Sequence, residues 1–171
     1  LLGSDGTGST LSPEVRNQAW FYLGKVFFLE GNRELAGENL ERVDGEILAE
    51  ANHDLFREWV FLRARVAMMS SRIEDESKLT SLKEQLEDTD IWSLYLQYNS
   101  AVAALDAGDV ATVEADLQTL IAIIQQSADS AEPEAEREGL LDRARLSLAR
   151  LYLRDDRFDA ALEILGDMPL N

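Results

Sequence analysis

The sequence predicts an all-α protein, built as an α-solenoid of about four antiparallel helical hairpins. Apolar residues recur three or four positions apart through most of the chain, as they do along one face of a helix. Small residues also recur at a fixed distance before residues that favour turns, which indicates a repeated pair of helices. No segment shows the sustained alternation of polar and apolar residues that is typical of a strand, so we expect no sheet.

The first pair of helices has clear start and stop signals. Ser12 and Pro13 predict an N-cap followed by the first helical position, and we expect this helix to end at about Glu30. Gly31 then allows a turn, and the second helix is expected to reach about Val43.

The remaining helices are expected from their apolar spacing and from the turns between them. They lie at about 50–70, around Leu79, Leu82 and Leu86, and at about 91–107, 110–126, 134–154 and 157–165. We therefore expect a flexible lead-in at 1–11 and one helical repeat domain at 12–171. Its units would be about 12–45, 46–88, 90–128 and 132–171. Because the chain begins with Leu1 and has no initiating Met, we also expect it to be a piece of a longer protein.

Aligning the turns brings out the repeat. The residues at equivalent turn positions are Gly31, Ser71, Gly108 and Asp156. Seven positions before each turn lies a small residue, which is Gly24, Ala64, Ala101 or Ala149. Five and nine positions after three of the turns come the pairs Ala36 and Leu40, Val113 and Leu117, and Ala161 and Leu165. The second unit departs from this pattern, and an unrelated helical bundle is the alternative.

One stretch carries a recognisable spacing, W-x2-L-G-x2-F followed by A-x3-L, formed by Trp20, Leu23, Gly24, Phe27, Ala36 and Leu40. It resembles the tetratricopeptide repeat. Phe27 stands where that family has Tyr, Leu40 stands where it has Phe, and the closing Pro is missing. From helical spacing alone, we expect Trp20, Leu23 and Phe27 to share the packing face, and Gly24 to let the second helix come close.

The resemblance implies a right-handed superhelix whose inner surface, lined by the first helix of each hairpin, binds a partner. Mapped onto this sequence, the partner-binding residues would be Phe21, Lys25, Phe28, Phe61, Arg65, Met68, Tyr98, Val102, Arg150 and Arg154. Basic and apolar side chains together favour a partner segment with apolar anchors and some carboxylates. The alternative is that these residues pack against the next turn of a longer solenoid or against further segments of the protein.

Composition excludes several classes of function. The formal net charge is −17, from 33 acidic and 16 basic residues, which argues against nucleic-acid binding and against anionic membrane surfaces. There is no cysteine, and no run of 18 apolar residues that predicts a membrane span. The single histidine, His53, is expected at the surface or at a helix end. We expect no catalytic residues, no metal and no cofactor, and therefore no enzyme.

The sequence thus favours a non-catalytic scaffold that binds a protein or peptide. The alternative is a structural spacer or oligomerisation segment of an envelope protein, without a peptide ligand. Leu162, Ile164 and Leu165 need a cover, which either a further repeat or self-association through the C-terminal repeat would supply. The segment from Val15 to Trp20 resembles exported helical-repeat proteins of bacterial cell envelopes. That resemblance implies the periplasm or envelope, with the cytoplasm as the alternative.

Overall fold

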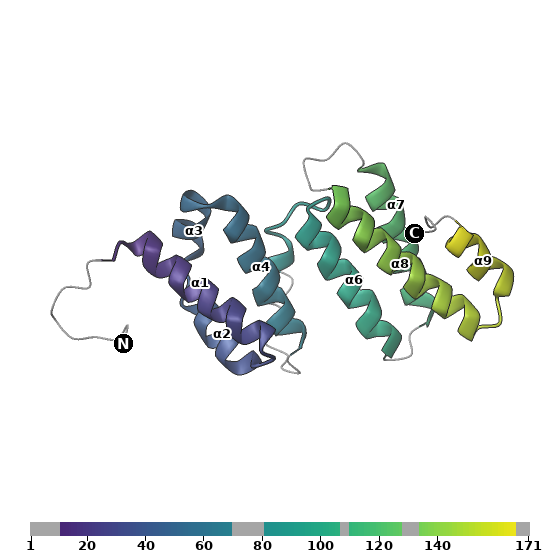
Figure 1. The fold of residues 1–171 in the computed structure, drawn as a ribbon, viewed down its shortest axis with the longest axis horizontal. Helices are drawn as coiled ribbons and strands as arrows, with labels where there is room; N and C mark the ends of the chain where they lie inside the picture. The colour runs from purple at the N-terminus through teal and green to yellow at the C-terminus, as the bar shows by residue number, and fades with distance from the viewer. Residues whose placement is uncertain (1–10, 70–80, 107–109, 128–133, 167–171) are drawn as a thin grey trace. The chain divides into compact units, whose positions relative to one another are not determined.

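The protein is described from a computed structural model, which covers residues 11–69, 81–106, 110–127 and 134–166. All regular secondary structure in these ranges is helical, as predicted, and they contain no strand (Figure 1). The chain divides into two compact units, Leu1–Leu79 and Thr80–Asn171, which are described separately below.

Four helices form the first unit. They are α1 (Pro13–Leu29), α2 (Arg33–Glu41), α3 (Gly45–Ala51) and α4 (His53–Met68). The helices α1 and α2 form a hairpin, α2 packs against α4, and α1 contacts both α3 and α4. The Ser12 hydroxyl accepts a hydrogen bond from the Val15 amide, and Pro13 opens the helix, so the predicted start of α1 is confirmed.

The close approach of α1 and α2 depends on Gly24. A Cβ atom added there would lie 2.6 Å from Cγ of Leu40, which is far inside van der Waals contact. Leu40 and Ala36 are both fully buried. The predicted role of Gly24 as the site where the second helix comes close is therefore confirmed.

The short helix α3 was not predicted. Asp44 and Gly45 suggested only a break, but the Asp44 carboxylate also caps a new helix by accepting from the amides of Glu46 and Ile47. The buried side chain of Asn17 on α1 holds this cap in place. Its amide donates to the Asp44 carbonyl, and its Oδ1 accepts from the Asp44 amide, both at 3.1 Å.

The packing face of α1 also differs from the prediction. Its buried residues are Asn17, Phe21 and Gly24, whereas Leu23 is exposed, and Trp20 is only half-buried. The expected face is thus rotated by about one residue. The physical reason is that α2 approaches α1 at Gly24, where Leu40 lies, and that Phe21 is buried on the same side, whereas Leu23 remains exposed.

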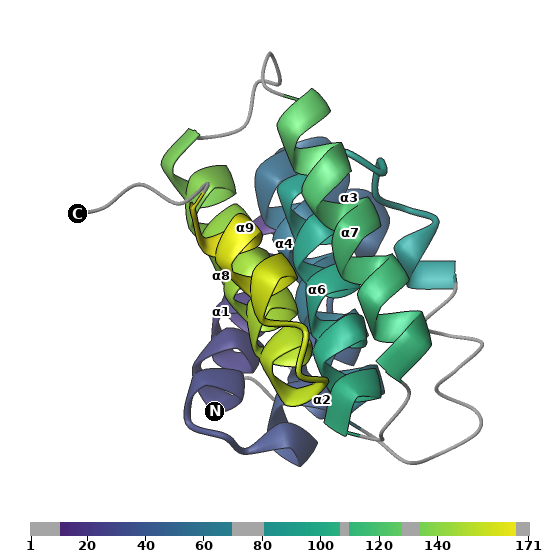
Figure 2. The same ribbon diagram turned by 90° about the vertical axis from the view of Figure 1, so that its right-hand side faces the viewer.

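The second unit contains two packed hairpins (Figure 2). One hairpin is α6 (Ile91–Asp106) with α7 (Val110–Gln126), and the other is α8 (Glu134–Arg154) with α9 (Phe158–Gly166). The hairpins meet where α8 packs against α6 and α7. These bounds agree with the prediction to within a residue. A further helix was expected around Leu82. Residues 81–83 are helical, and Leu79 lies outside the described residues.

Two of the four aligned turns are described, and they have the same geometry. Gly31 has φ of +78° and Asp156 has φ of +58°. In the first turn, the Gly31 amide donates to the Phe28 carbonyl, and the Asn32 amide donates to the Phe27 carbonyl. The turn at Asp156 repeats both hydrogen bonds. Both helices therefore end in a Schellman motif. Ser71 and Gly108 lie outside the described residues.

The small residues that define the repeat are all in the core. Gly24, Ala64, Ala101 and Ala149 are buried, as the alignment predicted. The residues after the turns that were aligned with Ala36 and Leu40 are also buried or packed against the core, namely Val113, Leu117, Ala161 and Leu165. The alignment therefore predicted the core positions of both units.

Candidate protein-binding surface

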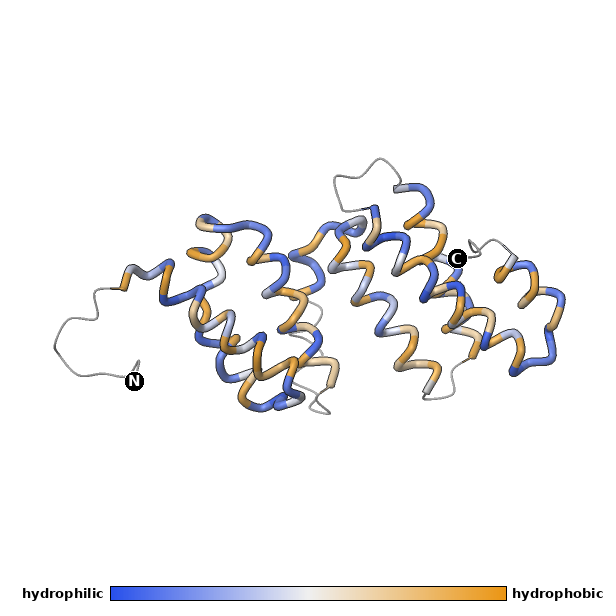
Figure 3. The backbone as a smooth tube through the Cα atoms, in the orientation of Figure 1, coloured by the Kyte–Doolittle hydropathy of each residue, from blue (hydrophilic) through white to orange (hydrophobic). Residues whose placement is uncertain are grey.

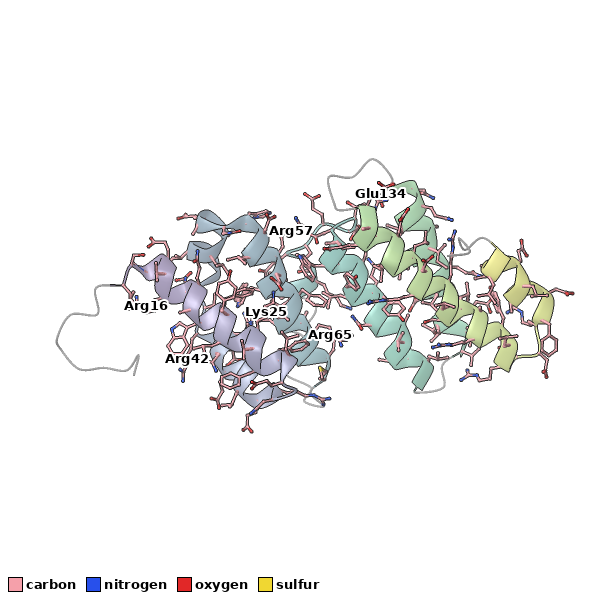
Figure 4. The ribbon with its side chains drawn as sticks, in the orientation of Figure 1. Arg16, Lys25, Arg42, Arg57, Arg65 and Glu134 are labelled. Carbon is pink, nitrogen blue, oxygen red and sulfur yellow. The ribbon has the colours of Figure 1, made fainter. Side chains whose placement is uncertain are left out.

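Two helices of the first unit bring together the basic residues expected on the binding surface. Lys25 lies on α1 and forms an ion pair with Glu58 on α4 (Figure 4). Glu58 shares one stripe of α4 with Phe61, Arg65 and Met68, because these positions are three, seven and ten residues further along the helix. The ion pair therefore places Lys25 beside the α4 stripe that carries Arg65.

Arg65 is a basic residue of this surface whose environment disfavours its charge. Burial lowers the pKa of its half-buried guanidinium, and the nearby positive charge of Arg33 lowers that pKa further. In the part of the chain that the structure describes, neither arginine forms an ion pair. Two like charges are thus near enough to influence each other in a protein with a net charge of −17. Such an arrangement favours an anion between or beside them.

Sequence reasoning missed Arg33, although a signal was present. Arg33 is the first residue of α2, where the positive end of the helix dipole disfavours a cation. An exposed arginine at this position is electrostatically unfavourable for the isolated helix. That cost, together with the burial of Arg65, distinguishes this pair from ordinary surface arginines.

The apolar candidates of the first unit divide into two groups. Phe28, Phe61 and Met68 are half-buried. Phe21 is fully buried in the core and contacts the ring of Tyr22 edge-on. A bound partner has no access to Phe21, so this expected surface residue is corrected to a core residue. The cause is the rotated packing face of α1.

The candidates in the second unit lie on α6 and α8, which pack against each other. The Tyr98 hydroxyl is 3.2 Å from the Ser147 hydroxyl, which links the two helices, and Val102 is half-buried one turn further along α6. Arg150 and Arg154 on α8 are exposed. They alternate with two exposed leucines that belong to the same face, Leu146 and Leu153.

The ten candidates therefore form two sets, six in the first unit and four in the second. The six lie on α1 and α4, and the four lie on α6 and α8.

Three further features concern His53, metal-ligating side chains and membrane-spanning helices. His53 is exposed at the first position of α4 and stacks on Phe56, so the expected helix-end histidine is confirmed. Among the described residues, no three metal-ligating side chains gather in one place. Within the same residues, no helix combines the length and the apolarity needed to cross a membrane.

The sequence matches no protein-family model, and no curated protein or solved structure matches it.

Proposed function

We propose that this chain is a non-catalytic interaction scaffold whose helical hairpins stack as a solenoid of the tetratricopeptide kind. The stacking of hairpins within each unit supports this arrangement, since α2 packs on α4 and α7 packs on α8. The first helices would then line a concave surface. Its ligand is an extended peptide with carboxylates next to apolar side chains.

The observation that carries the proposal is the position of Arg33 and Arg65. Half-burying the Arg65 guanidinium within electrostatic reach of Arg33 costs free energy, and no carboxylate of the described chain forms an ion pair that offsets that cost. A carboxylate from a partner would form charge-assisted hydrogen bonds with both groups, and these are the strongest polar contacts available to a protein surface. The acidic partner follows from this local charge, not from the net charge of the chain.

The apolar part of the proposed ligand follows from the neighbouring residues. Phe28 on α1 and Met68 on α4 are half-buried, and Met68 lies three residues after Arg65 on the same helix. In the second unit, exposed Leu146 and Leu153 alternate with Arg150 and Arg154. Both units thus combine arginine with apolar side chains on their first helices, which supports a peptide with alternating anchors.

A structural spacer without a ligand is the second candidate. The complete burial of Phe21 favours it, because this residue was expected on the binding surface. A spacer has no use for two neighbouring arginines without a carboxylate, and for this reason we place the scaffold first.

A random peptide library displayed on phage tests the scaffold directly. We expect selection on the wild-type chain to enrich peptides in which Asp or Glu lies close to an apolar residue. Replacing Arg33 and Arg65 together by Gln should weaken binding of the selected peptides by about tenfold or more, since hydrogen bonds to charged groups contribute roughly 1.5–3 kcal/mol each. Arg33→Gln alone should also weaken binding, and this residue is exposed, so its loss leaves the core intact.

The matched control replaces Arg16 and Arg143 by Gln. Both side chains are exposed, and the double substitution removes the same charge. It should change the Kd by less than about twofold, because distant surface charges are screened. Lys25→Glu is unsuitable, since it would place a carboxylate beside Glu58. Equal losses in both double variants, or no enrichment of acidic peptides, would contradict the proposal and favour the spacer.

A further inference from the structure

Helix α1 has a second apolar face in addition to its buried one. Val15, Tyr22 and Val26 are each about half exposed, and Leu29 is 74% exposed. Figure 3 shows hydrophobic and hydrophilic positions succeeding one another along α1. These four residues follow one another at intervals of seven, four and three, so they form one stripe along the helix. Leu23 borders this stripe and is also exposed. A water-exposed apolar stripe of this length typically marks an interface.

Helix α9 carries the other large apolar exposure. Phe158 is 57% exposed and Leu162 is 68% exposed, while Ala161 is buried. Among the described residues, α9 is the second helix of the last hairpin and α1 is the first helix of the first hairpin.

The repeat shows what contacts the position of Leu162 in the other hairpins. Leu162 directly follows the buried Ala161, just as Gly37 follows Ala36 and Glu114 follows Val113. A Cβ on Gly37 would lie 3.4 Å from Cγ1 of Val66, which belongs to α4 of the following hairpin. The Glu114 carboxylate accepts a hydrogen bond at 2.7 Å from Arg157, just after α8 of its own following hairpin. This position therefore faces the next hairpin in both units.

The same comparison shows what contacts the exposed face of α1. Val26 lies two residues after Gly24, as Val66 lies two residues after Ala64. Val66 is the residue that meets Gly37 of the preceding hairpin. Leu23 corresponds in the same way to Arg63, whose guanidinium experiences the charge of Glu41 at the end of α2. The exposed face of α1 is therefore the one that a preceding hairpin would cover.

We infer that α9 of one copy of this chain packs against α1 of a second copy. Each copy carries one face of each kind, so a second copy supplies what both faces need. The contact continues an interface that the chain already makes internally, between α2 and α4 and between α7 and α8. Leu23 and Leu162 occupy the positions that Arg63 and Glu114 have in the internal interfaces. Because leucine is apolar, burying these two side chains between copies favours association in water.

Such a contact joins two different surfaces, so each dimer retains one free face of each kind. Association of this type is heterologous and continues until a ring closes or a filament forms. The average mass should therefore rise steadily with protein concentration and should not stop at a dimer, unless a small ring closes first.

Disulfide trapping tests the predicted contact, because the chain has no cysteine of its own. The distance from a Cβ on Gly37 to Val66 indicates that residues 162 and 26 of neighbouring copies lie within the reach of a disulfide. Mixing Val26→Cys with Leu162→Cys under mild oxidation should give the mixed disulfide in several-fold excess over either symmetric one. In the control, Ala115→Cys, on the exposed side of α7, replaces Leu162→Cys. That pair should give no excess.

Sedimentation velocity tests the direction of association. Leu162→Glu or Leu23→Arg alone should leave the chain monomeric, since every copy then lacks one of its two faces. Both residues are exposed, and a circular dichroism spectrum checks that the helices remain. Mixing the two variants should restore a dimer that does not grow, because it joins the intact α9 of one variant to the intact α1 of the other.

Three results would overturn the inference. The first is a wild-type chain that stays monomeric at all concentrations, with no excess of the mixed disulfide. The second is a dimer lost only with Leu23→Arg, which would mean that α1 pairs with α1. The third is the failure of the two variants to associate with each other. None of these substitutions touches Arg33 or Arg65, so the outcome is independent of the proposed peptide surface.

Discussion

At the scale of single residues, Gly24 shows how a missing side chain sets the distance between two helices. Because a Cβ here would overlap Cγ and Cδ2 of Leu40, Gly24→Ala forces α1 and α2 apart or Leu40 out of its rotamer. We expect a loss of about 1–3 kcal/mol in the free energy of unfolding, which is more than the gain of about 1 kcal/mol in helix propensity. Urea denaturation followed by tryptophan fluorescence measures the difference.

Gly139→Ala is the matched control for that substitution. Gly139 also lies within a helix, but a Cβ at this position would meet no atom within 4 Å. Only helix propensity changes, so we expect stabilisation by about 0.5–1 kcal/mol. If the two substitutions shift stability in the same direction, the close approach at Gly24 is not what holds α1 and α2 together.

At the scale of helices and turns, Gly31 and Asp156 end their helices in the same left-handed backbone conformation, but only Asp156 has a side chain. A Cβ is strained at positive φ, so Gly31→Ala should destabilise the protein by about 1 kcal/mol, although nothing lies near the new methyl group. Asp156→Gly should have the opposite effect, of about 0.5 kcal/mol, because it removes the strain. Midpoints of urea unfolding distinguish the two. Destabilisation by Asp156→Gly would mean that the aspartate side chain stabilises its turn.

Helices with local signals could be predicted from the sequence, and features set by tertiary contacts could not. Ser12 and Pro13 mark the start of α1 in the sequence itself, and the small residue before each turn marks where helices approach. Helix α3 was missed because Asp44 is both a helix breaker and an N-cap, and only its contact with Asn17 distinguishes the two roles.

The candidate surface was predictable to a similar degree. Helix spacing placed Lys25 and Arg65 on first helices, and their neighbours in the structure agree with that placement. Phe21 was misplaced because the rotation of α1 depends on three other helices. Arg33 was missed because the spacing rule covers only first helices, and Arg33 belongs to a second helix.

At the scale of the whole molecule, the net charge of −17 opposes compaction, and local ion pairs act against this repulsion. Glu114 and Arg157 form such a pair between two hairpins, with Arg157 also lying over the ring of Tyr152 at 4.2 Å. The hydrogen bond from Arg157 lowers the pKa of Glu114 below its usual value of 4.5, and a hydrogen bond to Tyr152 lowers it further, while desolvation opposes both. A carboxyl whose folded pKa is lowered stabilises the fold above its unfolded pKa, and that contribution disappears as pH falls through the folded pKa.

The last prediction follows from the lowered pKa of Glu114. Glu114→Gln should lower the urea midpoint slightly at pH 7, and the difference from the wild-type chain should disappear as pH falls through the folded pKa of Glu114 and its carboxyl becomes protonated. Glu163→Gln is the control, because Glu163 is exposed on α9 and its loss changes the net charge by the same amount. It should raise the midpoint slightly or leave it unchanged, since it reduces the overall repulsion. An equal change of the midpoint at pH 7 in the two variants would mean that the Glu114–Arg157 ion pair contributes nothing to stability. A loss confined to Glu114→Gln would assign that loss to the ion pair that joins the hairpins.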